Sequence, residues 1–239
     1  MGILEDTLTW LTDPTHWSGP NGIPNRLAEH AGLSAVSLLI ALSIAFPVGL
    51  YIGHTRRGAT LAVNVANLWR ALPSLAVIAI VLPITAAIDP RAGFLVYPTV
   101  VAMVVLAVPP ILVNTFTGVV GVDPDVVEAA RGLGVNERRI LTAVELPLAV
   151  PVLVTGIRSA AAQVIATATL GAIFGFGGLG RYIVDGIAQF SLGGAAQMLA
   201  GVVLVAALVI ATDRAFAVIQ LLLTPRPIRP ERSVRPISA

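Results

Sequence analysis

Five long apolar stretches constrain this chain more than any other feature of its sequence. They cover residues 31–53, 63–88, 94–117, 148–173 and 195–218, and each is close to the ~20 residues that an α-helix needs to cross a bilayer. Only 12% of the residues are charged, about half of the roughly 25% found in soluble domains. We therefore expect an all-α membrane protein with about five transmembrane helices.

The residue types that are missing exclude several classes of function. The sequence contains no cysteine and no lysine, so disulfides, thiol catalysis and the Gly-Lys-Ser/Thr of a P-loop are excluded. His16, His30 and His54 lack the spacing of metal ligands. A net charge of +2 does not favour nucleic-acid binding. We expect no catalytic residue, cofactor or metal in this chain.

The arginines that flank the apolar stretches predict the orientation in the membrane, because cytoplasmic flanks are enriched in basic residues. The flanks 54–62, 118–147 and 224–239 form one side, and the remaining flanks form the other. The first side holds nine arginines and the second holds three: Arg56, Arg57, Arg131, Arg138, Arg139, Arg226, Arg229, Arg232 and Arg235 against Arg26, Arg91 and Arg181. The first side is expected in the cytoplasm, with the N-terminus outside.

One long polar segment, DPDVVEAARGLGVNERRILTAVELP at residues 123–147, interrupts the apolar stretches. Asp123 is a good N-cap for a first short helix, and Gly134 is suited to the left-handed turn that follows it. Asn136 is placed to cap a second helix, which we expect to stop before Pro147. The segment is predicted to be two short helices and a turn.

These residues resemble the EAA loop of binding-protein-dependent ABC importer permeases. That family's pattern is Glu-Ala-Ala, three residues, Gly, nine residues, then Ile-x-Leu-Pro, and Val144 here replaces the isoleucine. The matching residues are Glu128, Ala129, Ala130, Gly134, Leu146 and Pro147. The resemblance implies that loop 118–147 carries a cytoplasmic coupling helix. That helix would dock in a cleft of a separate ATPase subunit, which would hold ATP and Mg²⁺.

Three further segments are similar to permeases that take up glycine betaine, choline or proline. They are RALPS (70–74), PPILVNTFTGVVGVDPD (109–125) and LGAIFGFGGLGRYIVDGI (170–187). The resemblance implies a multi-pass protein of the bacterial plasma membrane. It also implies a second permease subunit, identical or related, and an extracytoplasmic substrate-binding protein. An ABC permease for methionine or another amino acid remains an alternative, as does a secondary transporter driven by an ion gradient.

The glycines at 175, 177, 178 and 180 suit a tight turn with close helix packing. They do not indicate a nucleotide loop, because no strand–helix–strand unit precedes them.

Polar residues inside the apolar stretches are candidates for lining a pathway. Ser159, Gln163 and Thr167 recur every four residues and therefore share one helix face, and Asn114 is a similar case. Either they line the pathway or they form hydrogen bonds between or within helices, and both interpretations stay open.

Arg158 lies inside the fourth apolar stretch, where an unpaired charge facing lipid is costly. We expect it to pair with an acid, Glu145 or Asp213, or to lie at the membrane interface.

The chain is expected to divide into three parts. Residues 1–30 form an extracytoplasmic segment, either a short interfacial helix or a floppy extension. Residues 31–223 form the transmembrane domain. Residues 224–239 are expected to be a disordered, basic cytoplasmic tail that lies against anionic lipid.

Overall fold

A computed structural model describes residues 2–224, apart from the side chain of Arg70. Within these residues the chain is helical and contains no strand. The α-helices are α1 (Ile3–Thr12), α2 (Ile23–Thr55), α3 (Ala59–Arg70), α4 (Ser74–Ile88), α5 (Ala92–Leu95), α6 (Tyr97–Val120), α7 (Pro124–Gly132), α8 (Glu137–Ile140), α9 (Leu146–Gly171), α10 (Gly180–Ala188) and α11 (Ala195–Leu223). Short 3₁₀ turns cover Pro14–Trp17, Ala172–Phe174 and Phe190–Leu192, and a π-helical turn covers Leu141–Glu145. The expected tail lies outside the described residues, except for residue 224.

Four described helices are long and apolar enough to cross a bilayer: α2, α6, α9 with the turns that flank it, and α11. The predicted span 63–88 is instead a bent pair, α3 and α4, whose axes differ by 90°. The bend lies at Pro73, directly before α4, because proline disfavours the helical conformation in the residue before it. The count of spans is four, or five if the bent pair is one broken span.

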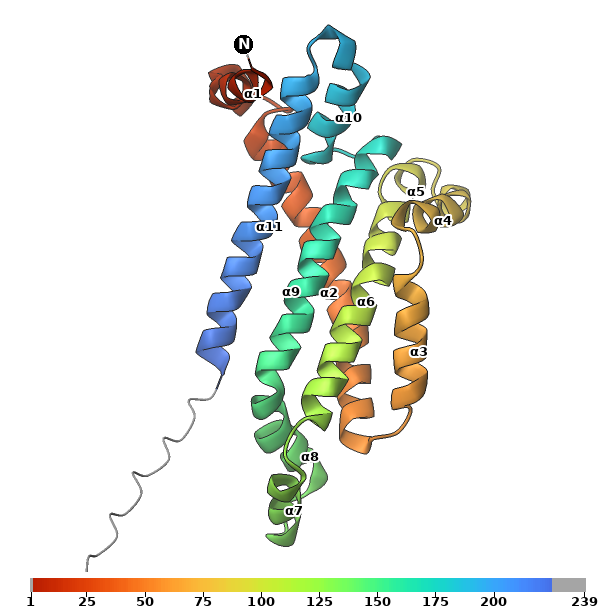
Figure 1. Ribbon diagram of the computed structural model, residues 1–239. Helices are drawn as coiled ribbons and strands as arrows, with labels where there is room; N and C mark the ends of the chain where they lie inside the picture. Colours follow the sequence, from red (N-terminus) through yellow and green to blue (C-terminus); the bar gives the residue numbers. More distant parts are fainter. Residues whose placement is uncertain (1, 225–239) are drawn as a thin grey trace, which may run out of the picture.

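Helix α2 also begins earlier than the apolar stretch predicts. It starts at Ile23, with Pro24 in its first turn, a position where the missing N–H of proline costs nothing. Residues 23–30 of the predicted N-terminal segment 1–30 therefore belong to helix α2. The first part of that segment is helix α1, which packs against α11 (Figure 1).

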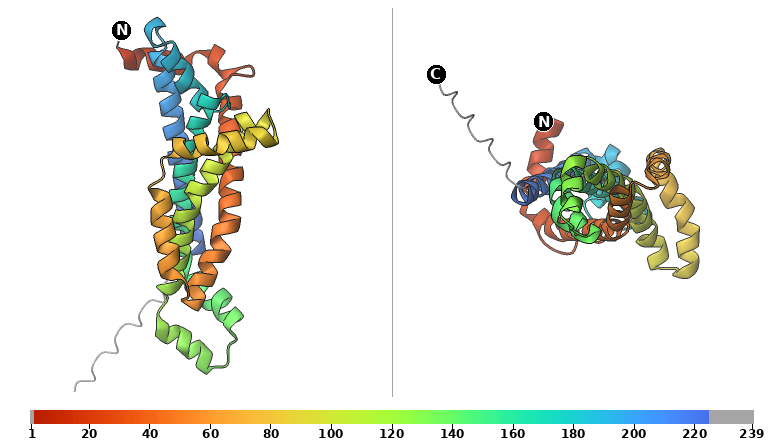
Figure 2. Two further views of the ribbon diagram at one scale, coloured as in Figure 1. Left: turned by 90° about the vertical axis from the view of Figure 1, so that its right-hand side faces the viewer. Right: turned by 90° about the horizontal axis from the view of Figure 1, so that it is seen from below.

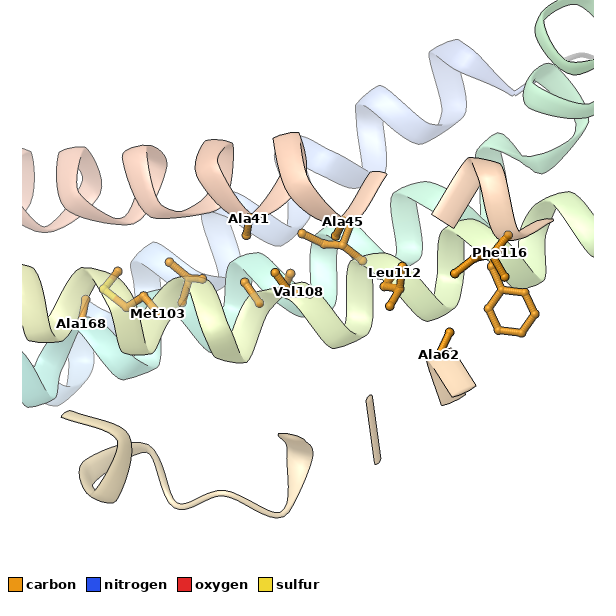
Figure 3. Packing of buried hydrophobic residues seen from close by; sticks show 13 residues of the cluster. Ala41, Ala45, Ala62, Met103, Val108, Leu112, Phe116 and Ala168 are labelled. Atoms are coloured by element: carbon orange, nitrogen blue, oxygen red, sulfur yellow. The ribbon is translucent and has the colours of Figure 1, made fainter. Parts of the chain in front are cut away.

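Helix α6 forms the centre of the bundle, between α2 and α9 (Figures 1 and 2). Figure 3 shows the buried side chains along it, with Ala41 and Ala45 of α2 opposite Met103, Val108 and Leu112 of α6. Small residues allow the backbones to approach closely, as is common between membrane helices. A Cβ atom at Gly156 of α9 would lie 2.5 Å from Cβ of Asn114 in α6.

The glycine-rich turn between α9 and α10 shows the close packing that the sequence predicts. Gly178 has a φ of +72°, and its N–H donates to Oε2 of Glu29 in α2 at 2.7 Å. A Cβ atom at Gly180 would lie 2.5 Å from the carbonyl oxygen of Thr169. The turn therefore ties α10 to both α9 and the start of α2.

Candidate functional site

The α7–α8 hairpin (residues 124–140) projects from one end of the bundle, opposite α1 and α10 (Figure 1). Oδ1 of Asp123 accepts from the N–H of Asp125 at 2.9 Å, and Oδ1 of Asn136 accepts from the N–H of Arg139 at 2.9 Å. Gly134 has a φ of +79°. The predicted caps and turn are thus present, because these residue types satisfy the free N–H groups at helix starts and the left-handed turn between the helices.

The end of the hairpin differs from the prediction. Helix α8 passes through the π-helical turn Leu141–Glu145 directly into α9, so Pro147 does not interrupt the chain. Pro147 lies in the first turn of α9, and the wider π turn before it changes the hydrogen-bond pattern where proline has no N–H to donate. The second short helix is therefore a continuation of a long spanning helix.

The hairpin has a buried face and an exposed face. Val127 packs with Val122 and Ile140, and all three are buried. On the outer side Val126 and Leu133 are exposed, and Leu133 retains 85% of its accessible surface. The outer face of the hairpin therefore includes apolar as well as charged side chains.

The six residues that match the EAA pattern are divided between these two environments. Glu128, Ala129 and Gly134 are exposed, whereas Ala130, Leu146 and Pro147 are half-buried. Val126 and Leu133 lie beside the exposed members and were not among the predicted site residues. In the sequence, each could have been recognised as an apolar side chain within or directly after a short polar helix.

An ionic network joins the hairpin to α2. Nδ1 of His54 donates to Oε2 of Glu145 at 2.6 Å, and its Nε2 lies 3.3 Å from Oε2 of Glu137. Arg131 completes the network with hydrogen bonds of 2.7 and 3.0 Å to Glu137, and this contact raises the pKa of Arg131 above its ordinary value. The network includes α7, α8, the π turn and α2.

Arg158 is the charged side chain that the sequence places inside the fourth apolar stretch. It donates to both carboxylate oxygens of Asp213, at 2.8 and 2.9 Å, and to Gln220 at 3.1 Å. Of the two acids proposed as its partner, Asp213 is the one in contact, because Glu145 is bonded to His54. The bidentate pair links α9 to α11.

A cavity of about 330 Å³ lies beside the break between α3 and α4. Gln163 and Thr167 of α9 line it, together with Ser74 at the start of α4. Non-helical backbone at membrane depth is tolerated where it lines a cavity or is buried in protein. The cavity therefore lies where the span is broken, and it brings together two of the four candidate pathway residues.

The other two candidate pathway residues lie elsewhere. Nδ2 of Asn114 donates to the carbonyl oxygen of Pro110 at 2.8 Å, one turn earlier in its own helix. Ser159 is exposed on α9. The shared spacing of Ser159 with Gln163 placed it on one face of the helix, but the cavity covers only the part of that face beyond residue 160.

The histidines lie in three separate places. His16 stacks on Trp10 at a ring distance of 3.9 Å, and His30 is fully buried, with Nε2 3.0 Å from the carbonyl oxygen of Ile165. His54 belongs to the ionic network. The three side chains are therefore held by different partners, and His30 lies inside the bundle.

Comparison with known proteins places the chain among transport proteins. Residues 45–224 match the family described as binding-protein-dependent transport system inner membrane component. A choline transport system permease protein, OpuBB of Bacillus subtilis (strain 168), is 34% identical over 197 residues, which are 82% of this chain and 86% of the relative. The glycine betaine/carnitine/choline transport system permease protein OpuCB of the same organism is 32% identical, over 87% of this chain and 92% of the relative.

The fold has a counterpart among solved structures. The MetNI methionine ABC transporter in an inward-facing conformation contains a chain that superposes with a TM-score of 0.73 at 24% identity. The superposition covers 90% of this chain and 100% of the other. At that identity the likeness concerns the fold.

Proposed function

The chain belongs to the family of binding-protein-dependent transport system inner membrane components, and from this membership we propose that it is the permease subunit of an ATP-driven importer for a compatible solute. The observation that carries the proposal is the match to that family over residues 45–224, together with relatives of more than 30% identity that transport choline, glycine betaine and carnitine by name. Glycine betaine, choline, carnitine and proline are the candidate solutes.

The exposed face of the α7–α8 hairpin is the proposed contact with the ATPase. Glu128 offers a charged hydrogen-bond acceptor, Ala129 allows close approach, and Leu133 offers an apolar surface of the kind that partners bury. ATP and Mg²⁺ belong to the partner, because a chain without lysine has no P-loop. Movement of the hairpin reaches α9 through the π turn and α2 through His54.

The proposed solute pathway passes the cavity beside Gln163 and Thr167. Four or five spans form a bundle that packs around α6 and leaves α11 mostly exposed, so one chain does not enclose a pathway. A second permease subunit, identical or related, would provide the opposite wall, and a substrate-binding protein would deliver the solute. The arginine distribution favours a cytoplasmic hairpin and an extracytoplasmic N-terminus.

A methionine or other amino-acid importer is the alternative within the same family. Both kinds of importer would have this same fold, so only the transported solute distinguishes them. Initial uptake of radiolabelled glycine betaine into vesicles, with choline, carnitine, proline and methionine as competitors, distinguishes the two. Competition by methionine without competition by choline or carnitine contradicts the proposed solute class.

The class of transporter is tested by purification from native membranes in mild detergent, followed by mass spectrometry of the proteins that accompany the chain. We expect an ATPase with a P-loop, a permease partner and a binding protein. A chain that is purified alone, and remains alone after crosslinking, would favour a transporter driven by an ion gradient.

A further inference from the structure

A polar pocket of about 450 Å³ lies at the end of the bundle opposite the α7–α8 hairpin. Its walls come from the N-terminal segment, the start of α2 and helix α10, which lie together at that end (Figure 1). The volume is in the range of small-molecule sites, about 300–1,000 Å³. The pocket shares no lining residue with the cavity beside Gln163.

One wall of the pocket is aromatic. The ring of Trp10 stacks on His16 at 3.9 Å and meets the ring of Tyr182 edge-on at 5.1 Å. These rings are fixed in place, because Nδ1 of His16 is 2.8 Å from the carbonyl oxygen of Trp10 and the hydroxyl of Tyr182 donates to the carbonyl oxygen of Asn21 at 2.7 Å. Aromatic faces attract cationic ligands, above all alkylated ammonium groups.

The remaining walls carry charged side chains of both signs. Arg181 and Asp185 form a salt bridge of 2.6 Å on α10, and both line the pocket. Arg26 also lines it and pairs with Glu29 at 2.8 Å. Nη2 of Arg26 donates to Oδ1 of Asn21 at 2.6 Å, while its buried Nε has no hydrogen-bond partner among the described residues.

The aromatic wall and the charged walls together favour a ligand that carries both a positive and a negative charge. A plain anion meets the carboxylate of Asp185, and a plain cation meets the guanidinium groups of Arg26 and Arg181. A molecule with both charges can pair its carboxylate with a guanidinium and place its ammonium group near Asp185 and the aromatic wall. We propose that the pocket binds a small zwitterion that carries a carboxylate and an alkylated ammonium group.

The inference goes beyond the proposed function, because it places a second solute site on this subunit and requires neither an ATPase nor a binding protein. The test is equilibrium dialysis of the purified full-length chain in lipid nanodiscs against radiolabelled glycine betaine. Choline, which lacks the carboxylate, and tert-butylacetate, which has the same shape without the positive charge, serve as competitors. We expect saturable binding of glycine betaine, with each competitor weaker by about tenfold or more, since each loses one charged contact.

Three variants decide whether the pocket is the site. Asp185→Asn keeps the size of the side chain and removes its charge, and Arg26→Gln removes the charge with a shorter polar side chain. Each is expected to weaken binding by about tenfold. Arg91→Gln removes an exposed arginine from the connection between α4 and α5 and is expected to bind as the unchanged chain does. Elution volume and thermal unfolding of each variant show that it is folded.

Two results overturn the inference: no saturable binding by the unchanged chain, or equal binding by the chain and by folded Arg26→Gln and Asp185→Asn. Its failure is distinguishable from failure of the proposed function. If vesicles with the complete transporter accumulate glycine betaine while the isolated chain does not bind it, the second site is refuted and the transport proposal stands.

Discussion

His54, in the last turn of α2, donates through Nδ1 to Oε2 of Glu145 at 2.6 Å, although the two residues are 91 positions apart in the chain. Glu145 is only 3% exposed and belongs to the π-helical turn that leads into α9. A carboxylate this buried needs a partner, because an unpaired buried charge is costly. The pair therefore fixes the α7–α8 hairpin to α2 at the base of the bundle.

The first prediction concerns this pair. His54→Phe keeps the aromatic volume but leaves Glu145 without its donor, and we expect a loss of about 2–3 kcal/mol in unfolding free energy. Glu145→Gln keeps a hydrogen-bond acceptor for His54 and is expected to cost about 1 kcal/mol or less. Denaturant or thermal unfolding in detergent measures both. Equal losses in the two variants would show that shape, and not the hydrogen bond, explains the contact.

The second prediction concerns Glu128, which is exposed on α7. Glu128→Ala is expected to leave the unfolding free energy within about 0.5 kcal/mol, as for most surface changes. It is expected to reduce the recovery of the ATPase in a pull-down, and uptake with it, by about tenfold. Asp125→Ala removes the same charge from the same helix and is the matched control. Unchanged uptake in Glu128→Ala would count against the docking role.

The extent to which the sequence predicted these features depends on how local their causes are. The apolar stretches predicted the spans because bilayer thickness fixes helix length. The caps at Asp123 and Asn136 were predictable because each acts on residues within three positions. The stretch 63–88 was predicted as one span, and the 90° angle between α3 and α4 was not predicted, because mean hydropathy over a window carries no information about direction. The start of α2 was placed too late because Pro24 and Arg26 are residue types common in loops.

Contacts between residues that are far apart in the chain could not be predicted from the sequence. The partner of Arg158 was narrowed to two acids, and the geometry of α9 and α11 decided for Asp213. The pair of His54 and Glu145 had no signal, because neither residue belongs to a spaced motif. Among the candidate pathway residues, helical spacing grouped Ser159 with Gln163, and only the position of the cavity separates them.

The third prediction tests the pair of Arg158 and Asp213. Asp213→Asn leaves the guanidinium without its counter-charge, and we expect a loss of about 2–3 kcal/mol, the scale for a charged side chain inside a membrane helix. The double variant Arg158→Leu with Asp213→Leu removes both charges and is expected to recover most of that loss. Unfolding in detergent is the measurement. Arg158→Leu and Asp213→Leu are also measured singly. If the double variant loses as much unfolding free energy as the two single variants together, the pairing argument is contradicted.

The fourth prediction compares two glycines. An alanine at Gly180 would place its Cβ 2.5 Å from the carbonyl oxygen of Thr169, and Gly132 has nothing within 4 Å of the same position. Gly180→Ala is expected to destabilise the protein by about 1–3 kcal/mol through overpacking. Gly132→Ala, in helix α7, is expected to stabilise it by up to about 1 kcal/mol, because alanine is the better helix former. Thermal unfolding midpoints in the same detergent compare the two directly, and a destabilised Gly132→Ala contradicts the open position seen at α7.

The fifth prediction separates two positions on one face of α9. Gln163 lines the cavity beside the break between α3 and α4, whereas Ser159 is exposed one turn earlier. Gln163→Leu replaces the polar group that meets a hydrated solute with an apolar one of similar size, and we expect the initial rate of glycine betaine uptake to fall by about tenfold. Recovery of the ATPase in a pull-down should not change, because the α7–α8 hairpin lies at the end of α9 away from Gln163.

Ser159→Leu is the matched control. It adds a similar apolar side chain to the same helix, and its uptake is expected to stay near that of the unchanged protein. If the control loses uptake and Gln163→Leu does not, the pathway follows the exposed side of α9, and the cavity at the broken span serves packing alone.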